Sequence, residues 1–454
     1  MKKVLCAGLI MGLSMMTSVA FAAHNDKDNN GNNAMTPFAR IAKIPVVVDE
    51  KGKIDREATY EKAKEVALDI ARYIAHVNDV AASDFPANWI VGGLEGGETA
   101  DDAAINSAIL RIPSPELIDP KQPELGIKKA NVMDLCNAYY AKQALGVASI
   151  TDDGKKVVNG YSHAPALPCE LSTWNDDEHI YVDMLDPNAI FTLFFTDVFV
   201  SEEMQDPDFE AAISALPPAV KGEIKTAVYN ALDAAGYNYK ATDQATGPKY
   251  KDLDAVFDVV ASSPNVSPFK HVAYTKPDNA DGEEVVFGPG ETHAVAEAIM
   301  QAMTIHGEPD AGNQVDELES ILSPGSKWRS ARHEPLGLPG TPEKNWIIEA
   351  CSPTYAKMAM STGMHHVTAL PCEIAVQRVD RDDNGSTESL VISYLDPNFM
   401  LGALFADMSE KEKEALGGIP ALILNDLETI VQYSLDNSDT ELEPGVQIWY
   451  TMLP

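Results

Sequence analysis

The sequence predicts an α+β protein made of two tandem copies of one domain, each an antiparallel sheet with helices packed on one face. The first observation is an internal repeat, because the segment HAPALPCE that starts at His163 recurs as HVTALPCE from His366. The second is that helical and strand periodicities fall in separate segments of each copy, as in α+β domains. A chain of 454 residues is long enough to give each of two domains its own buried core.

The repeat extends over three blocks, which indicate the domain organisation. Corresponding residues lie 215, 203 and 210 positions apart in these blocks, so the copies differ by short insertions and deletions. We expect a signal peptide at 1–22, a flexible leader at 23–36, a first domain at 37–240 and a second at 241–454. The blocks pair Cys136 with Cys351, His163 with His366, and Asp186 with Asp396.

The N-terminus has the pattern of a secretory signal peptide. Lys2 and Lys3 precede an apolar run over 4–19, and Ala20-Phe21-Ala22 fits a cleavage site. Residues 24–35 are polar and rich in asparagine, which is typical of a flexible segment. We therefore expect an exported protein, periplasmic or secreted, in a compartment that permits disulfide bonds.

The chain is strongly acidic, with a formal charge of −35 that becomes −37 once Lys2 and Lys3 leave with the signal peptide. This charge disfavours nucleic acids and anionic membranes as partners, because both would repel it. After the signal peptide, no segment of the sequence reaches the ~20 apolar residues that a membrane span needs. A solvated acidic surface that keeps an exported protein soluble explains the charge.

Each domain is expected to open with an amphipathic helix, at 56–77 in the first copy and 291–305 in the second, because apolar residues recur there at helical spacing. A short strand follows and ends at the first cysteine of the copy. Asn137 or Ser352 comes directly after that cysteine and is a good N-cap for a second helix.

An antiparallel hairpin comes next in each copy. Apolar residues alternate along its first strand, so that Cys372 faces the core and Glu373 faces away. The first copy repeats this pattern, and a second alternating strand follows a short polar turn. A closing helix is expected at 218–235 and again at 420–437.

Three motifs make each copy resemble the family called domain of unknown function 302. The resemblance implies a helix-on-antiparallel-sheet fold similar to that of the TATA-binding protein, and it implies no activity. The motifs are Cys136-Asn137 and Cys351-Ser352-Pro353, Leu167-Pro168-Cys169 and Leu370-Pro371-Cys372, and Leu185-Asp186-Pro187 and Leu395-Asp396-Pro397.

The four cysteines beyond the signal peptide form two matched pairs, Cys136 with Cys169 and Cys351 with Cys372. An even number in an exported protein predicts disulfides, and the repeat favours one bond in each copy. The bonds would close loops of 32 and 20 intervening residues. Each would stabilise the fold by about 3 kcal/mol. The alternative is a redox-active pair, because a helix N-terminus after Cys136 or Cys351 lowers the pKa of the thiol.

A zinc or copper site in each copy is a second alternative. Each copy carries histidine, cysteine, histidine and cysteine in chain order, and these ligands suit either ion. A straight strand from the second histidine to the second cysteine would hold them roughly 20 Å apart, which is too far for one ion. The residues are His76, Cys136, His163 and Cys169, and His306, Cys351, His366 and Cys372.

Two further groups are candidate ligand contacts. The turn with Asp380, Asp382 and Asn384 resembles the start of a calcium loop. It lacks a glutamate at the twelfth position and is also explained as a hairpin turn. Matched candidate pocket residues are Glu170 and Glu373, and Tyr140 and Tyr355.

The sequence offers no assignable catalytic centre, because it lacks the spacings of a catalytic triad, a haem attachment site or a phosphate loop. We expect an exported binding or interaction protein for an unidentified small molecule or protein. Its two domains are expected to pack as an intramolecular pseudo-dimer, with a groove between them. The alternative is a thiol-disulfide redox or metal-handling protein that uses one cysteine pair, with histidines, in each copy. We expect no cofactor, and zinc, copper or calcium is the alternative.

Overall fold

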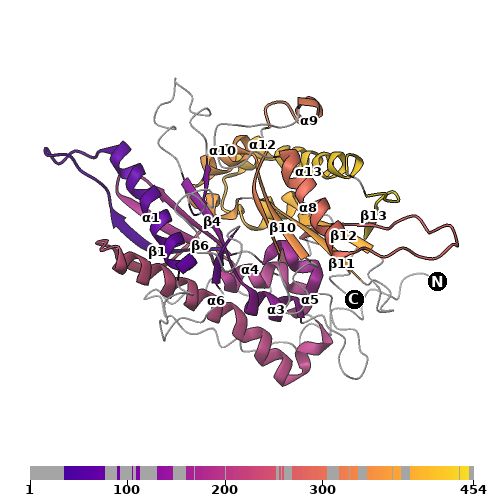
Figure 1. Ribbon diagram of the computed structural model, residues 1–454. Helices are drawn as coiled ribbons and strands as arrows, with labels where there is room; N and C mark the ends of the chain where they lie inside the picture. Colours follow the sequence, from indigo (N-terminus) through magenta and orange to yellow (C-terminus); the bar gives the residue numbers. More distant parts are fainter. Residues whose placement is uncertain are drawn as a thin grey trace, which may run out of the picture. The chain divides into compact units, whose positions relative to one another are not determined.

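A computed structural model describes most of the chain between residues 35 and 448 (Figure 1). The predicted signal peptide lies outside the described residues. These are 35–76, 89–92, 105, 109–112, 130–146, 160–167, 169–199, 201–251, 255–256, 258–259, 268–303, 316–326, 328–335, 345–370, 372–379, 389–438 and 440–448.

The first half of the chain forms an antiparallel sheet with the strand order β2-β4-β5-β6-β1-β7, and β3 also pairs with β4. Its centre is the predicted hairpin β5–β6, whose turn is closed by Asp176 accepting hydrogen bonds from the backbone N–H groups of Glu178 and His179. The strands are β1 (Phe38–Pro45), β2 (Trp89–Val91), β3 (Leu110–Ile112), β4 (Ala130–Asn137), β5 (Cys169–Asn175), β6 (His179–Leu185) and β7 (Lys240–Thr246).

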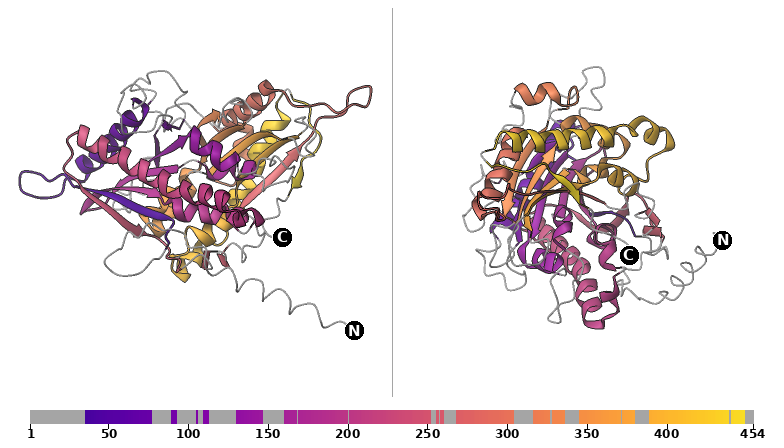
Figure 2. Two further views of the ribbon diagram at one scale, coloured as in Figure 1. Left: turned by 90° about the horizontal axis from the view of Figure 1, so that it is seen from below. Right: turned by 90° about the vertical axis from the view of Figure 1, so that its right-hand side faces the viewer.

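Helices α1 and α6 cover one face of this sheet (Figures 1 and 2). Val66 and Ile70 of α1 and Val228 of α6 pack in one cluster with Leu171 and Val182 of the sheet. The helices and 3-10 turns are α1 (Arg56–His76), α3 (Ala138–Gly146), η4 (Gly160–Ala166), α4 (Pro187–Phe194), α5 (Thr196–Phe199), η5 (Glu202–Gln205) and α6 (Pro207–Ala234).

The second half forms another antiparallel sheet, with the order β9-β10-β11-β12-β8-β13. Helices α8 and α13 pack on one face, where Ile299 and Ile430 belong to one buried cluster with Ile374 and Ile392 of the sheet. The elements are β8 (Phe269–Tyr274), α8 (Pro289–Met303), α9 (Asp316–Ile321), β9 (Arg329–Pro335), β10 (Asn345–Cys351), α10 (Pro353–Thr362), η7 (Met364–Ala369), β11 (Cys372–Val379), β12 (Ser389–Leu395), α11 (Pro397–Ala403), α12 (Glu410–Leu416), α13 (Ile419–Asp436) and β13 (Val446–Ile448). The α+β prediction, with antiparallel sheets and helices on one face, is confirmed.

Corresponding elements occupy corresponding places in the two sheets. Strands β4, β5, β6 and β1 follow one another as β10, β11, β12 and β8 do. Asp186 and Asp396 each N-cap the helix after the hairpin, α4 or α11, and each side chain accepts a hydrogen bond from an asparagine N–H two residues on. The predicted Asp-Pro-Asn block is therefore a helix start in both halves, because proline fits the first helical position.

The faces of the sheets that the helices leave uncovered pack against the other half of the chain. Val132 and Trp174 of the first sheet share a cluster with Met360 and Val367. The Ser172 hydroxyl oxygen lies 2.7 Å from that of Thr368. Turn η4 contacts β8, β11 and β12, and turn η7 contacts β4, β5 and β6, so each half inserts a turn over the sheet of the other. Both sheets thus lie within one compact unit, Ala34–Pro454.

Several element boundaries differ from those predicted. Helix α6 begins at Pro207, not at 218, because the Asp206 side chain caps it and Pro217 and Pro218 lie inside it. The last two residues of the predicted leader already belong to the fold, since Met35 exchanges backbone hydrogen bonds with Tyr250 and the next residue is buried. Strand β7 extends across the predicted boundary at 240.

No helix within the described part of the chain has the length and apolar character that crossing a membrane requires.

Candidate functional site

The paired cysteines point to opposite faces of their sheets. Cys169 lies directly opposite Leu135 across β4 and β5, so Cys136, the next residue of β4, projects from the other face. Cys351 and Cys372 show the same offset across β10 and β11. None of the four forms a disulfide. The disulfide prediction is therefore wrong. The strands pair as expected, but the two cysteines of each pair are offset by one residue across the strands, and this offset places their side chains on opposite faces of the sheet.

Burial suppresses the reactivity of one thiol in each half. Burial, together with the neighbouring Glu170, raises the pKa of Cys169 to about 12. Burial, together with Glu373, likewise raises the pKa of Cys372 to about 12. Both thiols are protonated at neutral pH, and a protonated thiol is a poor nucleophile and metal ligand.

The predicted histidines pair with aspartates and not with cysteines. His163 donates from Nε2 to Asp197 Oδ1 at 2.8 Å, and His366 donates from Nε2 to Asp407 Oδ1 at 2.9 Å. The groups of described residues that could hold a metal ion contain no cysteine. Among the described residues, the mixed cysteine and histidine site is therefore not formed. His306 and the side chain of His76 lie outside the described residues, as do Asp380, Asp382 and Asn384 of the candidate calcium turn.

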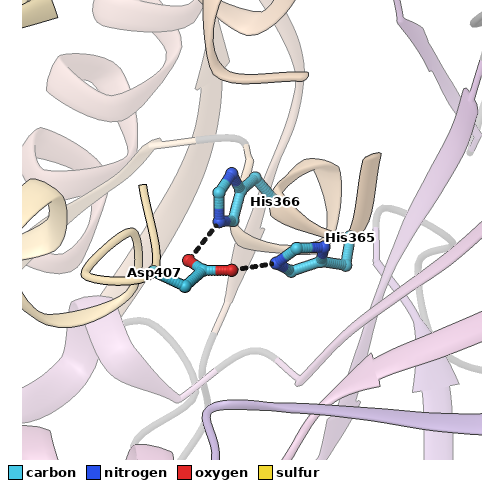
Figure 3. Close-up of side chains that lie close together, drawn as sticks. All are labelled: His365, His366 and Asp407. Carbon is cyan, nitrogen blue, oxygen red and sulfur yellow. Dashed lines mark hydrogen bonds and ion pairs between the residues drawn. The ribbon is translucent and has the colours of Figure 1, made fainter. Parts of the chain in front are cut away.

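In the second half another histidine joins this pair (Figure 3). His365 donates from Nε2 to Asp407 Oδ2 at 3.0 Å, so two imidazoles hold one carboxylate. Burial raises the pKa of Asp407, but the hydrogen bonds from His365 and His366 outweigh it and hold that pKa well below its usual range. Burial lowers the pKa of His366. The group has the ligand types of a metal site, although both carboxylate oxygens already accept hydrogen bonds.

Each half contains an apolar pocket of similar composition. In the first half the pocket lies among α3, α4 and α6, and in the second among α10, α11 and α13. Their empty volumes, open mouths included, are about 620 and 660 Å³, and among the described residues no charged side chain lines either. Matched lining residues are Cys136 and Cys351, Tyr140 and Tyr355, Cys169 and Cys372, Pro187 and Pro397, and Val220 and Ile423.

The two predicted tyrosines line these pockets, whereas Glu170 and Glu373 do not. Both glutamates follow a cysteine that faces the helices, so they point to the opposite face of the sheet. Each pocket also lies wholly within one half, so the predicted groove between the halves is not where these pockets form.

On the closing helix of each half, one carboxylate accepts hydrogen bonds from two aromatic side chains that line the pocket. Glu223 accepts hydrogen bonds from the indole N–H of Trp89 at 2.7 Å and from the hydroxyl of Tyr140. Asp426, at the matched position of α13, accepts from Trp328 at 3.0 Å and from Tyr355 at 3.2 Å. Sequence reasoning missed both carboxylates and both tryptophans. Glu223 and Asp426 lie 203 residues apart, as His163 and His366 do, and this shared spacing could have identified the two carboxylates as matched positions.

Four carboxyl groups meet where the sheets face each other. Asp134 lies directly opposite Glu170, and Glu349 lies directly opposite Glu373. All four are buried, with 0–7% of each residue exposed. Burial raises the pKa of Asp134 well above its usual range, and Glu349, Glu373 and Glu170 add to the effect. Burial also raises the pKa of Glu170 to about 8, against a backbone hydrogen bond that lowers it.

A buried histidine in the same interface predicts how stability depends on pH. Burial, and then the neighbouring His163, lowers the pKa of His271 to about 3. The folded protein keeps this ring neutral, while the unfolded chain takes up a proton near pH 6.5. Stability is therefore lost as pH falls below about 6.5, by about 2 kcal/mol at pH 5. Between pH 7 and pH 5, the free energy of unfolding of His271→Gln, measured in urea, should fall by correspondingly less than that of the wild type. Equal losses in the two proteins would contradict the assignment of this pH dependence to His271.

Comparison with known proteins identifies one family. Residues 337–422 match the family described as Domain of unknown function DUF302. The match spans β10, both strands of the second hairpin and the start of α13. The resemblance predicted from the motifs is thus confirmed for the second half. No curated protein and no solved structure matches the chain.

Proposed function

We propose that the two halves are two copies of one DUF302 domain and that the chain is an exported protein that binds small apolar molecules, one in each domain. The observation that carries the proposal is the pair of matched, uncharged pockets. A wall without charges favours an apolar ligand, because a charged one would lose its hydration without a compensating partner.

The surroundings of the pockets suit specific binding. In each pocket a tyrosine hydroxyl and an indole N–H are fixed by one carboxylate, so that two aromatic rings stand in a single orientation. Aromatic rings held in this way offer a large contact area at low entropic cost. Of the cysteines that line the pockets, Cys169 and Cys372 are held protonated, which favours binding over thiol chemistry at these two positions.

Titration with the uncharged fluorophore N-phenyl-1-naphthylamine tests the proposal. We expect its fluorescence to rise with a stoichiometry of two per chain, because each pocket excludes water from the probe. The probe would be excited at a wavelength outside the absorption band of tryptophan. A protein that binds no probe, or binds it with equal strength after both pockets have been filled, would disprove the proposal.

Two matched variants fill the pockets separately. Val220→Trp narrows the first pocket and Ile423→Trp the second, since the two residues occupy corresponding places on α6 and α13. Each should remove one binding site, and the double variant should remove both. Recovering the protein after export from its host checks the remaining part of the proposal, because the N-terminus should then be Ala23.

A further inference from the structure

The four interface carboxyls lie in an arrangement that a protein without a bound cation would find costly. Each sheet places two acidic residues directly opposite each other on neighbouring strands, Asp134 with Glu170 and Glu349 with Glu373. Like charges in this position destabilise a sheet. The same costly pair occurs in both sheets, and the two pairs face each other across the interface.

Two of these carboxylates keep oxygen atoms available to a ligand. Asp134 is 4% exposed and Glu170 is 5% exposed. Asp134 Oδ1 and Glu170 Oε2 are buried, and neither accepts a hydrogen bond from the protein. Oxygens of Asp134, Glu170 and Glu373 all lie within 4.8 Å of one another. A buried carboxyl group with an unused lone pair either keeps a proton or binds a cation, because desolvation of an unpaired charge is expensive.

We propose that a hard divalent cation, such as Ca²⁺ or Mn²⁺, binds among Asp134, Glu170 and Glu373, with Glu349 beside them, and joins the two halves of the chain. Two oxygens bound to one Ca²⁺ at 2.3–2.6 Å stand up to about 5 Å apart, which agrees with the observed spacing. The ligands are carboxylates alone, and such a set suits Ca²⁺, Mn²⁺ or Mg²⁺ better than zinc or copper.

The position of the site makes this a structural cation. Asp134 and Glu170 come from β4 and β5 of the first half, and Glu373 comes from β11 of the second. An ion held by residues of both halves links them, so its binding is coupled to their docking during folding. The cation then stabilises the folded chain by an amount that grows with its concentration.

The test uses the full chain after treatment with EDTA, followed by CaCl₂, MnCl₂ or MgCl₂ in separate samples. Native mass spectrometry should show one tightly held Ca²⁺ or Mn²⁺ per chain. The melting temperature should rise by about 2–6 °C at cation concentrations 100 times the dissociation constant. Failure of all three ions to bind or to raise the melting temperature would overturn the proposal and leave shared protons as the account of the cluster.

Matched variants distinguish cation binding at this site from cation binding to other acidic residues of the protein. Glu170→Gln combined with Glu373→Gln should abolish both the bound ion and the melting shift, and in EDTA it should melt no lower than the wild type, because it removes two buried acidic groups from the cluster. Asp197→Asn removes a buried carboxylate outside the cluster and should keep the full response. If the double variant does not fold, Glu170→Gln alone should raise the dissociation constant at least tenfold. An unchanged cation response in either cluster variant would overturn the proposal.

Discussion

Arg40→Met is expected to reduce the free energy of unfolding by on the order of 3–5 kcal/mol, because it leaves the buried carboxylate of Asp183 without a positively charged partner. Arg40 holds Asp183 through two parallel hydrogen bonds of 2.9 and 3.1 Å, and Asp183 is fully buried. The guanidinium also lies 3.8 Å from the centre of the Tyr181 ring, so the loss includes packing against an aromatic face. Urea unfolding of the full chain measures the effect.

The second half supplies the control for this prediction. At the positions corresponding to Arg40 and Asp183 it has His271 and Ser393, whose Nδ1 and hydroxyl oxygen lie 2.7 Å apart. Combining Arg40→His with Asp183→Ser installs this uncharged pair in the first half. The double variant should recover part of the loss, since the indole N–H of Trp174, which donates to Asp183 at 2.8 Å, loses that acceptor. A loss below about 1 kcal/mol for Arg40→Met would show that the ion pair is solvated.

Asp426→Asn is expected to cost on the order of 3–4 kcal/mol, since it disturbs a buried carboxylate that accepts four hydrogen bonds. The donors are the backbone N–H and hydroxyl of Ser323 at 2.9 and 2.7 Å, and the side chains of Trp328 and Tyr355. An amide presents two N–H groups where donors already point, so at least one donor is left unsatisfied. The change in urea midpoint, with the m-value held constant, measures the loss.

Glu223→Gln is the matched variant in the first half. Glu223 accepts hydrogen bonds from Trp89 and Tyr140 and is only partly buried, so its replacement should cost about 1–2 kcal/mol. Equal losses for the two variants would contradict the view that burial and the number of donors set the cost.

Features that depend on neighbouring residues in the chain could be predicted from the sequence. Alternation along 370–376 predicted the second hairpin and the inward direction of Cys372, because residues two apart share a face of a strand. Asn137 was predicted as an N-cap, and its side chain accepts hydrogen bonds from the N–H groups of Tyr139 and Tyr140. Ser352 also stands at an N-cap, although its side chain makes no capping hydrogen bond.

Features that depend on register could not be predicted. The cysteine pairs lie on neighbouring strands, as expected, yet the partner of Cys169 across the ladder is Leu135. Register is set by the packing of the whole sheet, and a shift of one residue moves a side chain to the other face. Periodicity within one strand contains no information on that shift.

By itself, the sequence determined the α+β class, the hairpin of each half with helices before and after it, and which side of the hairpin strands faces the helices, because these follow from periodicity over a few residues. It did not place β1 and β8, which precede the helices that were predicted to open the two domains. Only the tertiary structure decided what covers the opposite side. Glu170 and Glu373 are directed away from the helices as predicted, but the other half of the chain buries them. Burial of that face depends on how two sheets dock, and contacts between residues more than 200 positions apart leave no local pattern in the sequence.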